Sequence, residues 1–344
     1  MDLDSLKRQL QSHFTDGLVL IVGSGLSCAE GLPGMGQLAA HIRSEVPKSL
    51  ASDDGAAWFK LEPLLASDGL EGALFKVEIS DRLQETISTL TADYVAAAER
   101  VVLADVFSGK RSLRLSALIP HLLKTKASLP VVTTNYDRLI EVAFEEAGLG
   151  VDSMFVGHFA GKLDETEAAL SLLRDVRMIS AKAVRKTFRP HAKIAKPHGS
   201  LDWYHRDGAP VRCALDLPGS QRLIIAPGKR KFRSGYDSPF DRQRERANRA
   251  IDAAARFLII GYGFNDDHLE THLKPALESG KPALLITRDV TPTAAAIVKG
   301  CSNVLAIERR DSDDRSRVFS STRSDTVELN LWDLGSFVSE VFRT

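Results

Sequence analysis

The sequence has few cysteines and no net charge. Cys28, Cys213 and Cys301 are the only cysteines among 344 residues, and no two of them form a CxxC pair. This argues against a disulfide framework and against a structural zinc site built on cysteine pairs. The 45 basic and 45 acidic residues cancel, so the molecule as a whole lacks the excess charge that would indicate a nucleic-acid or membrane partner.

Long apolar runs are also missing. No run approaches the roughly 18 residues that a membrane span requires. The N-terminal stretch MDLDSLKRQL has the pattern of a polar-faced helix and not of a signal peptide. We therefore expect a cytoplasmic protein with no membrane contact. The 44% hydrophobic content is enough for a sizeable core in a chain of this length.

What the sequence does contain is an alternation of short β-branched runs and helical patterns. Several runs are apolar throughout, as expected for strands covered by helices on both faces. The fold class predicted from this alternation is α/β, with a Rossmann-like, mostly parallel sheet. The predicted strands are 18–23, 129–135, 193–199, 222–228, 256–263, 282–289 and 303–308.

Two segments have helical periodicity without a convincing strand. Residues 37–125 are interpreted as a helical subdomain inserted after the first strand and helix, and residues 160–190 as a second helical segment. The stretch LWDLGSFVSEVF near the end predicts a short amphipathic helix. All of these elements are assigned to one domain over residues 1–344.

The stretch LVLIVGSGLSCAEGLPGM (18–35) places a glycine-rich turn between a strand and a helix. Such a turn can present backbone N–H groups to a pyrophosphate. It is not a dinucleotide fingerprint, since Cys28 occupies the position of the third glycine, and it has no GK[ST] for a triphosphate. Taken alone, it could equally be an ordinary turn of an α/β protein.

Three further polar clusters follow predicted strands. They are VVTTNYDRLIE at 131–141, IAKPHGSLDW at 194–203 and FLIIGYGFNDDHL at 257–269. Ligands of open α/β sheets bind at the carboxyl ends of the strands. These clusters are therefore expected to meet at one crevice.

Together the four motifs resemble a known family. GSGLSxxxGLP (23–33), TTNYD (133–137), KPHGS (196–200) and GYGFND (261–266) occur in this order over about 245 residues. The chain resembles the sirtuins, and more closely the sirtuin-like domains of bacterial anti-phage defence proteins. The resemblance implies chemistry on NAD⁺ in which the bond to nicotinamide is broken, without hydride transfer.

The resemblance also implies site residues. Asn135 and His198 would be catalytic, beside the ribose that carries nicotinamide. The glycine turn after the first strand would lie along the pyrophosphate and its ribose, and the glycines of GYGFND along the adenosine half. The residues that would line NAD⁺ are Gly23, Ser24, Gly25, Ser27, Pro33, Asp137, Gly261, Gly263 and Thr287.

These residue types suit cleavage of an N-glycosidic bond. Positive charge develops on the ribose in the transition state, and nicotinamide is a cationic leaving group that needs no general acid. Asn135 has a donor and an acceptor that can hold a water or a ribose hydroxyl in line. His198 can accept a proton near neutral pH.

Plainer explanations exist for the same residues. His198 followed by glycine could be a turn with a hydrogen-bonded histidine, and Asp137 could cap a helix. The sequence FNDDHL has the pattern of a cap for the helix that follows it. His268 and His272 share one helix face, but with no third ligand in view they predict no metal site.

Two departures from the protein-deacetylating sirtuins indicate hydrolysis of NAD⁺ by water. Those sirtuins carry two CxxC pairs that bind structural zinc, and this chain has none. They also carry GIPDFR where this chain has GLPGMG, so Gly34, Met35 and Gly36 supply neither the acidic residue nor the arginine. The predicted activity is an NAD⁺ glycohydrolase, with NAD-dependent protein deacylation as the alternative.

A free NADase would harm its own cell, so the resemblance also implies control. Family members act in abortive infection and are controlled by oligomerisation or by a partner. For this chain we expect a homo-oligomer and a partner in trans such as a hexameric DNA-translocating ATPase. The basic stretch 228–249 is either an interaction surface, including for nucleic acid, or a solvated face. A sensor of NAD or ADP-ribose, or a structural subunit, remains the alternative without turnover.

Overall fold

The molecule is built on one large sheet, seen in the computed structural model, which describes residues 2–123, 127–157, 159–180, 183–217, 219–225 and 237–342. The nine strands of this sheet follow the chain as listed next. They are β1 (Leu18–Val22), β2 (Ser128–Thr133), β3 (Gly150–Asp152), β8 (His191–Ala195), β12 (Arg256–Ile260), β13 (Ala283–Ile286), β14 (Val304–Arg310), β15 (Ser312–Phe319) and β16 (Ser324–Val327).

The order of strands across the sheet is β16-β15-β14-β13-β12-β1-β2-β8-β3. From β14 to β3 all neighbours pair in parallel, whereas β15 and β16 add two antiparallel strands at one edge. The predicted α/β fold with a mostly parallel, Rossmann-like sheet is therefore confirmed.

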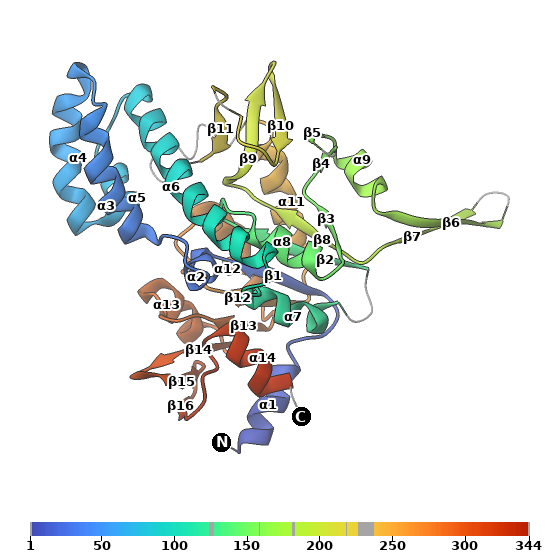
Figure 1. Cartoon of the computed structure of the whole chain (residues 1–344). Helices are drawn as coiled ribbons and strands as arrows, with labels where there is room; N and C mark the ends of the chain where they lie inside the picture. Colours follow the sequence, from blue (N-terminus) through green and yellow to red (C-terminus); the bar gives the residue numbers. More distant parts are fainter. Residues whose placement is uncertain are drawn as a thin grey trace.

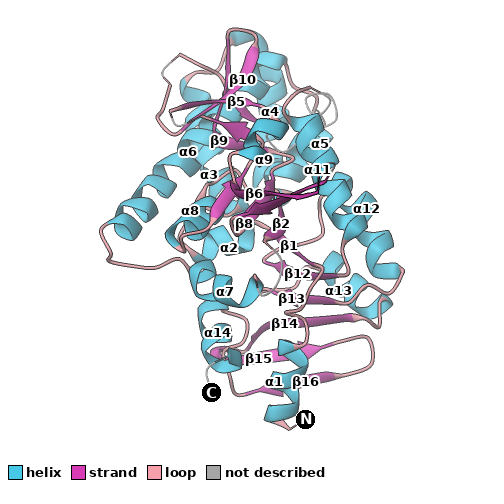
Figure 2. Ribbon diagram, turned by 90° about the vertical axis from the view of Figure 1, so that its right-hand side faces the viewer, coloured by secondary structure: helices cyan, strands magenta, loops and turns pink. Residues whose placement is uncertain are grey.

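Helices cover both faces of the large sheet (Figure 2). Alternate residues of β1 enter two separate cores: Leu18, Leu20 and Val22 pack in one, and Val19 and Ile21 in the other. Burial on both faces explains why these strands are apolar throughout. The helices on the second core are α11 (Phe240–Ala253), α12 (Asp267–Glu278) and α13 (Pro292–Gly300), and those on the first include α1 (Leu3–Gln11), α7 (Arg114–Leu122), α8 (Leu139–Glu146) and α14 (Leu334–Phe342).

A layer of helices separates β1 from β2 in the sequence and projects from one side of the sheet (Figure 1). The described residues between these strands contain helices and short 3-10 turns and no strand. The longest helix, α6, begins at a serine N-cap, where the Ser80 side chain accepts a hydrogen bond from Leu83 N. The α-helices of this segment before α7 are α2 (Ser24–Ala29), α3 (Met35–Glu45), α4 (Gly55–Ser67), α5 (Gly69–Lys76) and α6 (Asp81–Phe107).

A second, antiparallel sheet was not predicted from the sequence. Its strands are short, and the turn between β9 and β10 is formed by Asp207 and Gly208, both with positive φ, as in a type I′ hairpin. The predicted strand 222–228 contributes β11 here, and its last three residues lie outside the described chain. The order is β11 (Arg222–Ile224), β9 (Gly199–Arg206), β10 (Ala209–Cys213), β5 (Ala160–Leu163) and β4 (Phe155–Val156).

The prediction of a helical segment over 160–190 is wrong for most of that range. Only α9 (Glu165–Leu170) is helical, and β6 (Leu173–Ser180) and β7 (Ala183–Phe188) form a separate two-stranded hairpin. β-branched residues such as Val176, Ile179 and Val184 favour extended backbone. Because they are exposed, no core contact opposes that preference.

The C-terminal amphipathic helix is confirmed as α14, which packs against α7 and α1. Its buried residues are Leu334, Phe337, Val338 and Val341. Within the part of the chain that the structure describes, no helix is both long and apolar enough to cross a membrane.

Candidate functional site

The chain changes direction across the sheet at β1, which lies between β2 and β12. Such a switch point opens a crevice beyond the carboxyl ends of the strands, where ligands of open α/β sheets bind. A cavity of about 750 Å³ lies there. All eleven residues predicted for the site line it: Gly23, Ser24, Gly25, Ser27, Pro33, Asn135, Asp137, His198, Gly261, Gly263 and Thr287.

The turns after β1 and β12 touch through their backbones. A Cβ at Gly23 would lie 2.4 Å from Gly261 O, and a Cβ at Gly261 would lie 2.6 Å from Leu26 N. Gly261 also has a φ of 58°, which favours glycine. These glycines are therefore required by the contact between the two turns, whatever ligand the cavity takes.

Replacing Gly261 with alanine is expected to lower the free energy of unfolding by about 1–3 kcal/mol, because the new methyl group would displace packed backbone. Chemical denaturation of the purified variant measures this change. Gly36→Ala is the matched control, since a Cβ there meets nothing within 4 Å. Equal stability of the two variants would contradict the assignment.

The N–H groups of the first turn are used within the protein. Gly23 N donates to Ile260 O over 2.9 Å, and Gly25 N donates to Gly261 O over 3.0 Å. The expectation that both glycines present N–H donors to a phosphate is thus corrected by this structure. Ser24 is exposed at the start of α2 and lines the cavity.

Ser27, Asn135 and Asp137 form one buried network at the cavity wall. Ser27 Oγ donates to Asp137 Oδ2 over 2.6 Å, and Asn135 Nδ2 donates to Ser27 Oγ over 2.8 Å and to Gly23 O over 2.9 Å. Asn135 Oδ1 has no hydrogen-bond partner. The amide is therefore held by its nitrogen, with its oxygen left as an acceptor.

Burial raises the pKa of Asp137, while the Lys196 charge and the Ser27 hydrogen bond act in the opposite direction. Asp137 Oδ1 also accepts a hydrogen bond from Leu139 N at the start of α8. The capping role considered for Asp137 is thus present, and the same carboxylate serves the network.

His198 lies in the turn between β8 and β9, beside a residue that sequence reasoning missed. Its Nε2 lies 2.8 Å from Asp266 Oδ2, and both side chains are buried. Asp266 Oδ1 meanwhile caps α12 by accepting from Leu269 N, as the pattern FNDDHL indicates. The capping pattern identified Asp266, but only the fold brings it to His198.

Gly199 explains why a glycine follows His198. Its φ is 87°, and a Cβ there would lie 2.1 Å from Leu223 O of β11. Ile225 N donates to His198 O over 2.9 Å. The predicted strand 193–199 is therefore interrupted, and His198 is held in a tight turn instead of a strand.

Lys196 is fully buried under this turn. Its Nζ lies 3.0 Å from Glu141 Oε1 and 3.1 Å from Ser200 Oγ, and it also donates to Asp137 O. A buried ammonium with these partners joins the TTNYD loop to the KPHGS turn.

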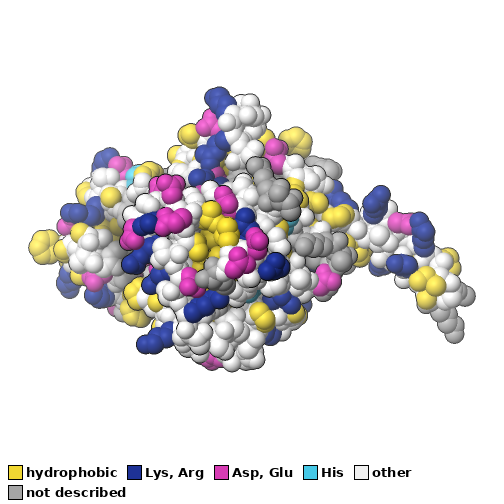
Figure 3. Space-filling model, turned by 90° about the horizontal axis from the view of Figure 1, so that it is seen from below, with side chains coloured by type: hydrophobic (Ala, Val, Ile, Leu, Met, Phe, Trp, Pro, Cys, Tyr) yellow, Lys and Arg dark blue, Asp and Glu magenta, His cyan; other side chains and the backbone are white. Residues whose placement is uncertain are grey.

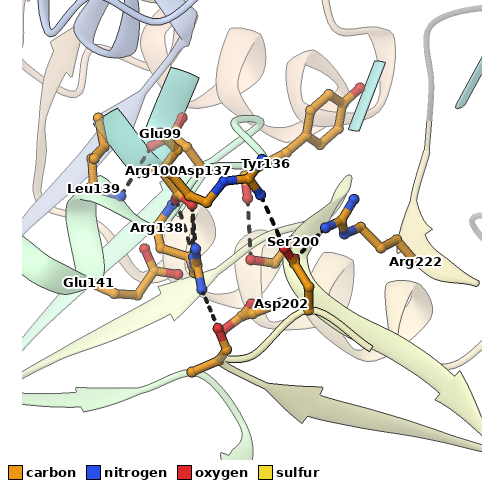
Figure 4. A network of polar contacts seen from close by, with 12 residues as sticks. Glu99, Arg100, Tyr136, Asp137, Arg138, Leu139, Glu141, Ser200, Asp202 and Arg222 are labelled. Atoms are coloured by element: carbon orange, nitrogen blue, oxygen red, sulfur yellow. Dashed lines mark hydrogen bonds and ion pairs between the residues drawn. The ribbon is translucent and has the colours of Figure 1, made fainter. Parts of the chain in front are cut away.

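The inserted helices are bound to the same loop. Glu99 of α6 accepts from Arg138 N and from the Arg138 guanidinium, as Figure 4 shows. Glu99 is fully buried, and burial with this pairing holds the guanidinium charged. The same helical layer contributes Leu38, Glu71 and Val95 to the cavity wall.

The opposite end of the cavity was only partly anticipated. Besides Thr287, it is lined by Arg309 and Trp332. The Arg309 guanidinium lies 6.0 Å from the centre of the Trp332 ring, and Trp332 Nε1 donates to Asp313 O over 3.1 Å. These residues follow edge strands with no motif, so the sequence carried no signal for them.

The basic stretch 228–249 is only partly visible. Lys229, Arg230, Lys231 and Arg233 lie outside the described residues. In the described part, Arg246 is buried with its Nη1 3.0 Å from Asp152 Oδ1. This arginine is used for internal pairing and not as a surface charge.

No group of three or more metal-ligating side chains occurs among the residues that the structure describes. His272 Nδ1 lies 2.9 Å from Asp252 Oδ1 of α11. This pairing joins two helices and gives His272 a structural role.

Comparison with known proteins follows from this geometry. A family model described as a SIR2-like domain matches residues 130–309. A solved structure described as "Structural Basis for the Mechanism and Regulation of Sir2 Enzymes" is 14% identical, with 98% of this chain and 97% of that chain covered and a TM-score of 0.43. A second, "The Structural basis of Sirtuin Substrate Affinity", is 12% identical, with 99% and 98% covered and a TM-score of 0.41. No curated protein matches the chain.

Proposed function

This chain belongs to the SIR2-like domain family, and we propose that it is an NAD⁺ glycohydrolase that releases nicotinamide and ADP-ribose. The observation that carries the proposal is the meeting of Asn135 and His198 in one cavity at the switch point of the sheet. In this proposal NAD⁺ is the substrate, and no metal takes part.

The cavity suits a ligand of this kind. Its volume of about 750 Å³ falls within the roughly 300–1,000 Å³ typical of small-molecule sites. Glu71, Asp137 and Asp266 also line it. Acidic side chains near the reacting sugar would favour the positive charge that develops as the glycosidic bond breaks.

The proposed reaction is a displacement by water at C1′ of the ribose. The C1′–N bond breaks with its electron pair passing to the nicotinamide nitrogen, and the water oxygen bonds to C1′. Asn135 Oδ1, left without a partner by the Ser27 network, would orient the water or a ribose hydroxyl. His198 would take the proton from the water and release it to solvent.

Hydrolysis is favoured over deacylation by the segment after the first motif. Gly34 is the N-cap of α3, and its N–H donates to Gln37 Oε1 over 3.0 Å. Met35 lines the cavity with an uncharged side chain. The acidic residue and the arginine of a deacetylase pocket thus have no counterpart in this segment.

We expect the purified chain to release nicotinamide and ADP-ribose from NAD⁺ without any peptide, and an acetylated peptide to leave the rate unchanged. Chromatography of the products, for the chain alone and with the product of the neighbouring gene, measures this. Nicotinamide release only with the peptide would identify a deacylase. Binding of NAD⁺ without release under every condition would identify a sensor or structural subunit.

The wider role is part of the same proposal. An enzyme that destroys NAD⁺ in the cytoplasm fits an abortive-infection effector of an anti-phage system. Such an enzyme requires control by oligomerisation or by a partner such as a hexameric DNA-translocating ATPase. Phage challenge of cells that carry the parental gene or a site variant tests this role.

A further inference from the structure

The β6–β7 hairpin is an arm that extends from the body of the molecule (Figure 1). We define the arm as residues 173–180 and 183–188. It forms a two-stranded sheet of its own, and every residue from Val176 to Ser180 and from Ala183 to Thr187 within it is exposed. A two-stranded hairpin with no cover is only marginally stable in water.

The two faces of the arm differ. Directly opposed residues of an antiparallel pair share a face. Met178 lies opposite Val184, and Val176 lies opposite Lys186, which makes one face apolar with a single lysine. Arg177 and Arg185 face each other on the other side, and like charges placed directly opposite destabilise a hairpin.

The apolar face is open to solvent. Val176 is 51% exposed, Met178 75%, Val184 53% and the neighbouring Ile179 68%. In Figure 3 the arm extends to the right and carries both hydrophobic and basic side chains. Arg177 is paired with Asp175, whereas Arg185 and Lys186 form no ion pair with any described residue. The arm thus presents apolar area together with uncompensated positive charge.

A surface of matching chemistry lies on the opposite side of the molecule. We define the corner as Phe59 of α4, Phe75 of α5, Glu78 between α5 and α6, and Glu85 in the first turns of α6. Phe59 is 83% exposed and Phe75 58%. Glu78 and Glu85 are exposed and form no ion pair with any described residue.

Charge supports the match beyond these two glutamates. Residues 55–107, which include α4, α5 and α6, contain nine acidic and four basic residues. Opposite charge on two apolar patches steers them together and fixes their orientation. Methionine against phenylalanine is also a favourable contact.

We propose that the arm of one copy of this chain docks on the corner of a second copy. Because the arm and the corner lie on opposite sides of one molecule (Figure 1), the contact cannot form within a single chain. It joins two different surfaces, so each copy still offers one free arm or one free corner. Such a contact produces a closed ring or an open filament, and not a simple twofold dimer.

The test uses the purified full chain and measures its mass in solution over a range of concentrations by sedimentation. The parental chain should associate, and less so at high salt, because the contact is partly ionic. The variant R185E/K186E and the variant E78K/E85K should each associate at least about tenfold more weakly. Lys299→Glu, an exposed charge reversal on α13, is the matched control and should associate like the parent.

Two combinations separate this contact from others. Uniting both charge reversals in one chain should restore association, since the ion pairs are then reversed in polarity. Mixing the arm variant V176S/M178S/V184S with the corner variant F59S/F75S should give a complex of two chains and nothing larger. Circular dichroism confirms that each variant is folded.

Several outcomes would overturn the proposal. A parental chain that stays monomeric at all concentrations would do so. So would arm variants that abolish association while corner variants have no effect, because arms would then pair with arms. Loss of nucleic-acid binding in R185E/K186E with unchanged association would assign the arm to nucleic acid instead.

Discussion

NAD⁺ turnover is expected to fall by about 10²–10⁴-fold when His198 is replaced by alanine, because a positioned general base contributes that much to a proton transfer. His198 is buried at the cavity wall with Asp266 beside its Nε2. No other histidine lines the cavity among the described residues, so none can take over the proton. The measurement is the rate of nicotinamide release at saturating NAD⁺.

Asn135→Ala should cause a loss of similar kind, since it removes the amide whose oxygen is free and leaves Ser27 without its donor. His205→Ala is the matched control, because His205 is exposed on β9, two strand turns from the site. Both site variants should keep the parental circular dichroism spectrum. A folded His198→Ala or Asn135→Ala enzyme with the parental rate would remove these residues from the mechanism.

Replacing Lys196 with methionine is expected to lower the free energy of unfolding by about 3–5 kcal/mol, the usual cost of removing one partner of a buried ion pair. Lys196 is 1% exposed, and its Nζ lies 3.0 Å from Glu141 Oε1. Without the ammonium, the Glu141 carboxylate would be a buried charge with no counterion. Chemical denaturation of the purified variant measures the loss.

The control for this prediction is a second substitution in the same chain. Lys196→Met combined with Glu141→Leu removes both charges and should regain most of the stability, because paired apolar replacements of buried ion pairs are often neutral. If the double variant is as unstable as the single one, the loss comes from the lysine's contacts with the TTNYD loop and not from the unpaired carboxylate.

The sequence by itself determined the parallel sheet and the position of the site. Strands such as β1 and β12 are covered on both faces, so their apolar character is visible in any short window of sequence. Each motif begins where such a strand ends, and parallel strands end at one edge of a sheet. That rule was sufficient to bring Gly23, Asn135, His198 and Gly261 to one cavity before the structure was known.

The arm and the second sheet needed the tertiary structure. Their strands are short and partly exposed, so no long apolar run or strict alternation distinguishes them. Residues 173–188 have a composition that suits a helix as well as a hairpin. The preference of exposed β-branched residues for extended backbone decided the outcome, and such a preference is weak and depends on context.

Only the tertiary structure decided which partners surround the motif residues. Asp266 lies 2.8 Å from His198 although 68 positions separate them in the chain, and Glu99 reaches Arg138 from an inserted helix. The glycines after β1 show the same limit, because their N–H groups donate to the neighbouring turn. A sequence motif records which residue types occur at a strand end, whereas their hydrogen bonds and ion pairs depend on elements that are distant in the chain and meet only in the packed fold.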